Sequence, residues 1–178
     1  DLIEKKLIRW MCGLAGYPKE GGALFVSGGS VANLTAQTAA RDTKLSYEER
    51  KKAVIYVSDQ THTSVTKGLH IIGFCREQIR TVPSDDCFCM DIAALQAAIQ
   101  SDIKNNRKPF VVIASAGTTN TGSIDPMAEI AVLCRKYDMW MHVDGAFGAS
   151  VLLSERYREK LSGIELSDSL SMDAHKWL

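Results

Sequence analysis

The stretch Phe110-Val111-Val112-Ile113-Ala114 is apolar at every position. In a β-strand successive side chains point to opposite faces, so a strand of this kind has an apolar surface on each side. Strands that are buried on both faces belong mostly to parallel sheets, in which helices connect the strands and cover them. This stretch therefore predicts one central strand of an α/β fold.

Similar short apolar runs alternate with longer amphipathic stretches, which is typical of strands and helices in turn. Strands or strand ends are expected at 24–26, 53–57, 79–82, 110–114, 139–143 and 170–172. Helices are expected at 2–12, 31–41 and 63–72, from the N-cap Asp91 to about 99, and from Asp125-Pro126, read as N-cap and first-turn proline, to about 137. The order predicts βαβ units with right-handed crossovers, and so a mostly parallel sheet flanked by helices.

The length and net charge of the chain limit the classes of partner that it can be expected to bind. The chain has 178 residues, of which 46% are hydrophobic, enough for one domain with a core. Its 21 basic and 21 acidic residues give a formal net charge of zero, so there is no field to attract nucleic acid or an anionic membrane. We therefore expect a small-molecule partner.

Compartment and metal content also have sequence signals. No stretch approaches the roughly 20 apolar residues of a membrane span, and the mixed charges near the N-terminus do not form a signal peptide. The five cysteines are an odd number without paired C-x-x-C spacing. These features predict a cytoplasmic protein with free thiols and no metal site.

Ligands of parallel α/β sheets bind at the carboxyl ends of the strands. The residues expected there are all polar or small: 27–30, 59–62, 117–119, 144–146 and 173–176. Each segment alone also has a purely structural interpretation, such as a glycine turn or a solvated lysine. Their joint occurrence is what indicates a binding site.

The segment Ser27-Gly28-Gly29-Ser30 is a candidate anion site. Glycines let the backbone approach a phosphate, and Ser30 adds a hydroxyl beside the free N–H groups of a first helical turn. No GxGxxG fingerprint is present, which argues against a nicotinamide or flavin cofactor. The segment 117–123 has the glycine spacing of a Walker A loop, but Ser123 stands where the phosphate-binding lysine is required, so a nucleotide triphosphatase is excluded.

Three further residues have the chemistry of one particular cofactor. Asp144 ends an apolar strand, and a cation at about 4 Å would interact with its carboxylate by roughly 4 kcal/mol, enough to hold a ring nitrogen protonated. Lys176 could form an imine with an aldehyde, and His62 could lie flat on an aromatic ring. Phosphate, ring nitrogen, aldehyde and ring face are the four features by which proteins hold pyridoxal phosphate (PLP).

Five ordered blocks carry a family resemblance: "SGGSVANL" (27–34), "SDQTHTSV" (58–65), "AGTTNTGSID" (116–125), "HVDGAFG" (142–148) and "DAHKWL" (173–178). They resemble the group II PLP-dependent decarboxylases of fold type I, which act on aromatic amino acids, glutamate and cysteine sulfinate. Members of this family are much longer. The resemblance implies that residues 1–178 are part of the large PLP-binding domain and that the complete protein is a homodimer.

The resemblance also implies roles for individual residues. Lys176 would form the imine, Asp144 would pair with the pyridinium nitrogen, His62 would stack on the ring, and Ala146 would pack on its other face. The phosphate would lie among Gly28, Gly29, Ser30, Asp173 and His175, with Thr119 beside the ring.

Two of these roles depend on local conditions. A carboxylate at 173 repels a phosphate unless it accepts backbone N–H bonds or is bridged by water. His175 and Lys176 are expected at a strand end, directed into the site, and not in a helix.

The substrate class follows only by analogy. The blocks "GTTNTGSIDP" and "HVDGAFG" are more similar to those of aromatic amino acid decarboxylases than to those of glutamate decarboxylases, so tryptophan, tyrosine or phenylalanine is expected. Three alternatives stay open: decarboxylation of glutamate or cysteine sulfinate, another fold type I activity such as that of an aminotransferase or desulfurase, and an inactive piece that serves as a binding module.

Overall fold

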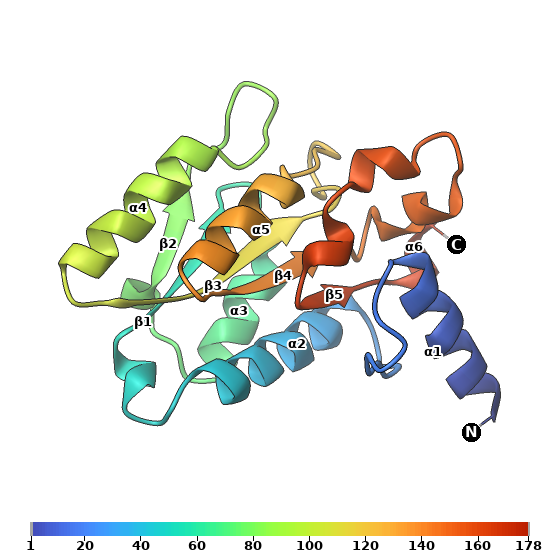
Figure 1. Ribbon diagram of the computed structural model, residues 1–178, viewed down its shortest axis with the longest axis horizontal. Helices are drawn as coiled ribbons and strands as arrows, with labels where there is room; N and C mark the ends of the chain where they lie inside the picture. Colours follow the sequence, from blue (N-terminus) through green and yellow to red (C-terminus); the bar gives the residue numbers. More distant parts are fainter. Residues whose placement is uncertain (1, 178) are drawn as a thin grey trace.

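The computed structural model of the chain describes residues 2–177 and contains a five-stranded sheet between two layers of helices (Figure 1). The strand order is β2-β1-β3-β4-β5, and every neighbouring pair is parallel. The strands are β1 (Ala53–Ser58), β2 (Ile79–Val82), β3 (Lys108–Ser115), β4 (Trp140–Asp144) and β5 (Ser169–Ser171). The predicted parallel α/β fold is confirmed.

Helices connect these strands. They are α1 (Leu2–Leu14), α2 (Gly29–Lys44), α3 (Thr63–Ile71), α4 (Ile92–Lys104), α5 (Met127–Lys136) and the single turn α6 (Ala174–Trp177). Short 3₁₀ turns are η1 (Glu49–Lys51), η2 (Arg76–Gln78), η3 (Ala149–Leu153), η4 (Arg158–Leu161) and η5 (Ile164–Leu166). Figure 1 shows α2 and α3 on one face of the sheet and α4 and α5 on the other.

The core is divided by the sheet into two apolar clusters. Val112 and Ala114 of β3 belong to the cluster on the α4–α5 side, whereas Val111 and Ile113 belong to the cluster on the α3 side. This alternation is the period of two that a strand imposes on its side chains. It confirms the expectation that 110–114 is a strand covered on both faces.

Two local expectations were wrong. Residues 24–26 form no strand, and Leu24 and Phe25 are exposed, so this run lacks the partner that burial requires. Asp125 does not cap α5, which begins at Met127. Its carboxylate is buried and must therefore be hydrogen-bonded, and it accepts the N–H groups of Met90 and Ser115 at 2.7 Å each.

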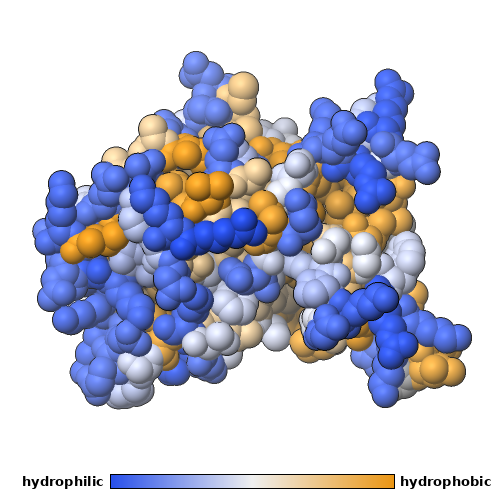
Figure 2. Space-filling view, in the orientation of Figure 1, coloured by the Kyte–Doolittle hydropathy of each residue, from blue (hydrophilic) through white to orange (hydrophobic). Residues whose placement is uncertain are grey.

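Hydrophilic residues cover most of the face in Figure 2, with hydrophobic ones in separate groups between them. No helix between residues 2 and 177 has both the length and the apolar character needed to cross a membrane. The cysteines, all of which lie in the described range, are free thiols as predicted.

Candidate active site

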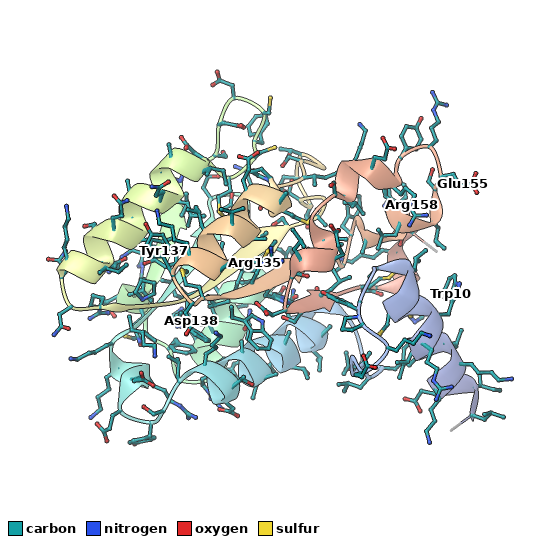
Figure 3. All side chains as sticks on the ribbon, in the orientation of Figure 1. Trp10, Arg135, Tyr137, Asp138, Glu155 and Arg158 are labelled. Atoms are coloured by element: carbon teal, nitrogen blue, oxygen red, sulfur yellow. The ribbon has the colours of Figure 1, made fainter. Side chains whose placement is uncertain are left out.

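A pocket lies where the carboxyl ends of β1, β3, β4 and β5 meet the start of α2. At the opposite end of the strands, Tyr137 and Asp138, labelled in Figure 3, lie just before β4, and Asp138 forms an ion pair there with Lys44 of α2. The pocket is therefore at the edge of the sheet that the rule for parallel α/β folds indicates.

The structure brings most of the predicted site residues together around this pocket. Those that line it are Gly29, Ser30, His62, Thr119, Asp144, Ala146, Asp173 and Lys176. Two predicted residues, Gly28 and His175, are not among the lining residues. Two more lining residues, Gly117 and Thr118, lie in the segment 117–119 that was expected at a strand end, but they had no assigned role. Four lining residues were not predicted: Asn33, Ser64, Ser115 and Phe147.

The first turn of α2 can approach the β4 loop because of its two glycines. Gly28 is the N-cap, with a φ of 141° that side chains rarely adopt, and its carbonyl accepts the N–H groups of Val31 and Ala32. A Cβ on Gly29 would lie 3.0 Å from the Cβ of Ala146. Gly28 therefore shapes the turn, and Gly29 lines the pocket.

Asp144 is held by neutral donors. Its Oδ2 accepts the side-chain amide of Asn33 at 2.9 Å, and its Oδ1 accepts the Ser171 hydroxyl and the Ala146 N–H at 3.2 Å each. A carboxylate has about four lone-pair positions. Three are occupied, which leaves room for one donor from the pocket.

The cation that Asp144 was predicted to need is not supplied by the described residues, since none of the ion pairs within 2–177 includes this carboxylate.

His62 is the N-cap of α3. Its Nδ1 accepts the Ser64 N–H at 3.2 Å and lies 2.7 Å from the Ser64 hydroxyl. These contacts fix the ring at the start of the helix while His62 stays exposed and lines the pocket.

Residues 173–177 differ from the expectation. The Oδ1 of Asp173 accepts the His175 N–H at 3.0 Å, so the chain leaves β5 in one helical turn, α6, and not at a strand end. His175 and Lys176 are both exposed, and only Lys176 lines the pocket. The Trp177 ring contacts Phe147 edge-on, with centroids 5.5 Å apart, and so joins this turn to the β4 loop.

Thr119 belongs to a loop held by hydroxyl groups. The Thr118 hydroxyl lies 2.6 Å from that of Thr121 and 3.0 Å from that of Ser123, and the Ser123 hydroxyl donates to the Phe88 carbonyl at 2.7 Å. These contacts hold the loop in place. They give its threonines and serine a structural role, so the likeness of 117–123 to a Walker A loop needs no bound nucleotide to explain it.

A polar network behind Asp144 was not predicted. Asn33 and His142 are fully buried, and His142 Nε2 lies 2.9 Å from Asn33 Oδ1. His142 Nδ1 lies 2.9 Å from the Ser169 hydroxyl, to which the Trp140 indole also donates at 2.8 Å. One signal was available: Asn33 stands four residues after Gly29, on the same face of a helix.

Burial is the largest influence on His142. It outweighs the attraction of Asp144 and lowers the pKa of His142 to about 4, below the ordinary value of 6.5. This imidazole is therefore neutral at physiological pH.

Comparison with known proteins supports the same family. Residues 1–178 match the model of the pyridoxal-dependent decarboxylase conserved domain. The chain is 46% identical to an aromatic-L-amino-acid decarboxylase of Bacillus atrophaeus, covering 100% of this chain and 37% of that protein. It is 36% identical to an L-2,4-diaminobutyrate decarboxylase of Rhizobium meliloti, covering 99% of this chain and 35% of that protein.

Solved structures agree with the sequence comparisons. The crystal structure of Oryza sativa TDC with PLP and tryptamine superposes with a TM-score of 0.92 at 30% identity, covering 99% of this chain and 39% of the other. The chain thus spans little more than a third of the length of the relatives it matches. The resemblance read from the five sequence blocks is confirmed, and this chain belongs to the family of pyridoxal-dependent decarboxylases.

Proposed function

We propose that the protein to which this chain belongs converts an L-amino acid to its amine and carbon dioxide with PLP as cofactor. The observation that carries this proposal is the convergence of Asp144 and Lys176, distant in sequence, on one pocket. Family membership and the likeness to a PLP-containing structure support the same cofactor.

The residues around the pocket fit PLP. The first turn of α2 offers the N–H groups of Gly29 and Ser30 to a phosphate, at the positive end of a helix dipole. Asp144 has one acceptor position left for a protonated ring nitrogen. PLP, when bound, supplies a protonated ring that takes up the electrons released as carbon dioxide leaves.

Each remaining residue has a proposed task. Lys176 offers its amine to the cofactor aldehyde, His62 packs against one face of the ring, and Ala146 packs against the other. Asp173 meets the condition for a carboxylate near a phosphate, because it already accepts the His175 N–H. His175 does not line the pocket, so we propose no phosphate contact for it.

An aromatic substrate is the proposal with most support. The Bacillus relative named for aromatic amino acids is 46% identical, against 36% for the Rhizobium relative named for diaminobutyrate. The test is a panel of amino acids given to the complete protein, with the amines and carbon dioxide measured. Faster release from glutamate or diaminobutyrate than from tryptophan or tyrosine would reject the aromatic assignment. A homodimer and a cytoplasmic location stay predictions.

The cofactor proposal has a direct test in Lys176→Ala. PLP added to the protein should produce an absorbance band at about 420 nm that disappears on reduction with borohydride, because the imine between a lysine and the PLP aldehyde absorbs there. The variant should lose the band entirely. Lys160→Ala, which removes another exposed lysine, is the matched control and should keep it. An unchanged band in Lys176→Ala would contradict the assignment of this lysine.

A further inference from the structure

A row of hydrogen bonds crosses the α2 side of the sheet and ends at Asp144. It runs from the Trp140 indole to the Ser169 hydroxyl, on to the His142 ring, then to the Asn33 amide, and finally to Asp144 Oδ2. Each donor and acceptor is 2.8 or 2.9 Å from the next. The row links β4, β5 and α2, and two of its three inner members, Asn33 and His142, are fully buried.

The polarity of this row is fixed at both ends. An ionised carboxylate can only accept hydrogen bonds, and an indole N–H can only donate them. Asn33 must therefore present its amide NH₂ to Asp144, which turns its carbonyl oxygen toward His142. His142 Nε2 must then donate a hydrogen.

The same reasoning continues to the other end. A neutral imidazole carries one N–H, so with Nε2 protonated its Nδ1 accepts the hydroxyl hydrogen of Ser169. The Ser169 oxygen in turn accepts from Trp140. The reverse order would place two acceptor oxygens, of Asn33 and Asp144, 2.9 Å apart. Only one direction satisfies every member.

We propose that Asn33, His142 and Ser169 are positioning residues, which lock Asp144 from behind so that its free acceptor position faces the pocket. His142 serves in this row as a neutral, Nε2-protonated spacer. Because all the donated hydrogens point toward the carboxylate, each bond polarises and strengthens the next. The consequence for the ring nitrogen of PLP rests on the proposed function. The direction of the row does not.

The direction can be read without cofactor by ¹⁵N NMR of the histidine rings in the chain. Four histidines are present, and His142→Gln identifies the signals of His142 by their absence. We expect one tautomer, with Nε2 protonated and Nδ1 bare, unchanged between about pH 5.5 and 8. A ring protonated on Nδ1 would overturn the proposal.

Variants at Ser169 separate positioning from mere packing. Ser169→Ala removes the donor to Nδ1 but keeps Asn33 and Asp144, so Nε2 should stay protonated while the ¹⁵N shift of the bare Nδ1 changes. Ser169→Thr keeps a hydroxyl and should restore the wild-type Nδ1 shift. Ser167→Ala is the matched control: it removes another buried serine hydroxyl, which bonds to Tyr17 and Ile164 and lies outside the row. A ring protonated on Nδ1 in Ser169→Ala would overturn the direction imposed from Asp144, and an Nδ1 shift equal to that of wild type would remove Ser169 from the row.

A second measurement connects the row to the pocket. The dissociation constant for PLP should rise about five-fold in Ser169→Ala, the effect of one hydrogen bond, and stay within about two-fold in Ser169→Thr and Ser167→Ala. Equal affinity in wild type and Ser169→Ala would show that the row only packs, and would overturn the positioning role. Failure of the wild-type protein to bind PLP would instead reject the proposed function, while the NMR result would still decide the direction of the row.

Discussion

Helices α5 and α2, which cover opposite faces of the sheet, bury different kinds of side chain. In α5 the buried residues are all apolar or weakly polar: Met127, Ile130, Ala131, Leu133 and Cys134. In α2, on the opposite face of the sheet, they are Asn33, Gln37 and Ala40. Helix α5 removes apolar surface from water, whereas α2 buries two amides that must be hydrogen-bonded.

This difference suggests different roles for the two helices: α5 stabilises the core, whereas α2 helps to build the pocket. A buried amide is costly unless it is paired, so α2 is a poor choice for core packing alone. Asn33 is paired at both ends, with Asp144 and His142, and lies at the pocket edge. Gln37 is paired at one end only: its Nε2 donates to the Val65 carbonyl, and its Oε1 is buried without a partner among the described residues. Of the two buried amides of α2, the one with both ends hydrogen-bonded, Asn33, is the one that lines the pocket.

Leu95→Ala should lower the free energy of unfolding by about 2 to 5 kcal/mol, because Leu95 of α4 is fully buried and its loss leaves a cavity in the apolar cluster on the α4–α5 side. Urea denaturation of the chain measures this. Val132→Ala, on α5 with 63% of its side chain exposed, should change the value by less than about 0.5 kcal/mol. A loss below about 1 kcal/mol in Leu95→Ala would mean that the apolar cluster on the α4–α5 side contributes little to the free energy of unfolding.

Acid should lower the free energy of unfolding through His142. His142 has a pKa of about 4 in the fold and an ordinary value of 6.5, so the unfolded chain takes up a proton first as the pH falls. The contribution is fully present above about pH 6.5 and is lost as the pH falls toward 4, to a total of about 3 kcal/mol. Asp144 is the charged group that faces this ring, while its other partners, Asn33 and Ser169, are neutral.

The measurement is the unfolding free energy at a series of pH values. His142→Gln cannot titrate and should show a flatter dependence between about pH 4 and 6.5. His175→Gln removes an exposed histidine and should leave the wild-type slope. Identical slopes in wild type and His142→Gln would contradict the neutral, buried histidine.

The two amides of α2 should respond unequally. Asn33→Leu removes one hydrogen-bond partner from Asp144 and leaves His142 Nε2 without its partner, and it should cost about 2 kcal/mol of unfolding free energy. Gln37→Met should change it by less than about 1 kcal/mol, since Oε1 has no partner and the Val65 carbonyl keeps its helical bond. Equal losses in the two variants would remove the distinction between paired and unpaired amides.

Most of the fold was predictable because its signals are local. The apolar run at 110–114 and the amphipathic periods around it depend on residues that are neighbours in sequence. The short run 24–26 gave a wrong prediction for the same reason: it has the composition of a strand, but no strand pairs with it.

The site was predictable as a set and not in its details. The rule that parallel strands place their carboxyl ends at one edge was enough to gather Gly29, His62, Asp144 and Lys176. It could not reveal that Asp173 starts a helical turn, since that depends on where one carboxylate oxygen finds its donor.

Residue types along the chain thus predicted the α/β architecture, which the structure confirms, and the meeting of an acid with an amine at one pocket. The anion-binding role of the turn at 27–30 stays a proposal. Packing in three dimensions decided the rest: that Asp125 binds Met90 and Ser115, that His175 does not line the pocket, and that His142 is a neutral link to Asp144. The physical reason is distance along the chain. A hydrogen bond between residues more than a hundred positions apart, such as that of Asn33 with Asp144, leaves no periodic trace in the sequence that encodes it.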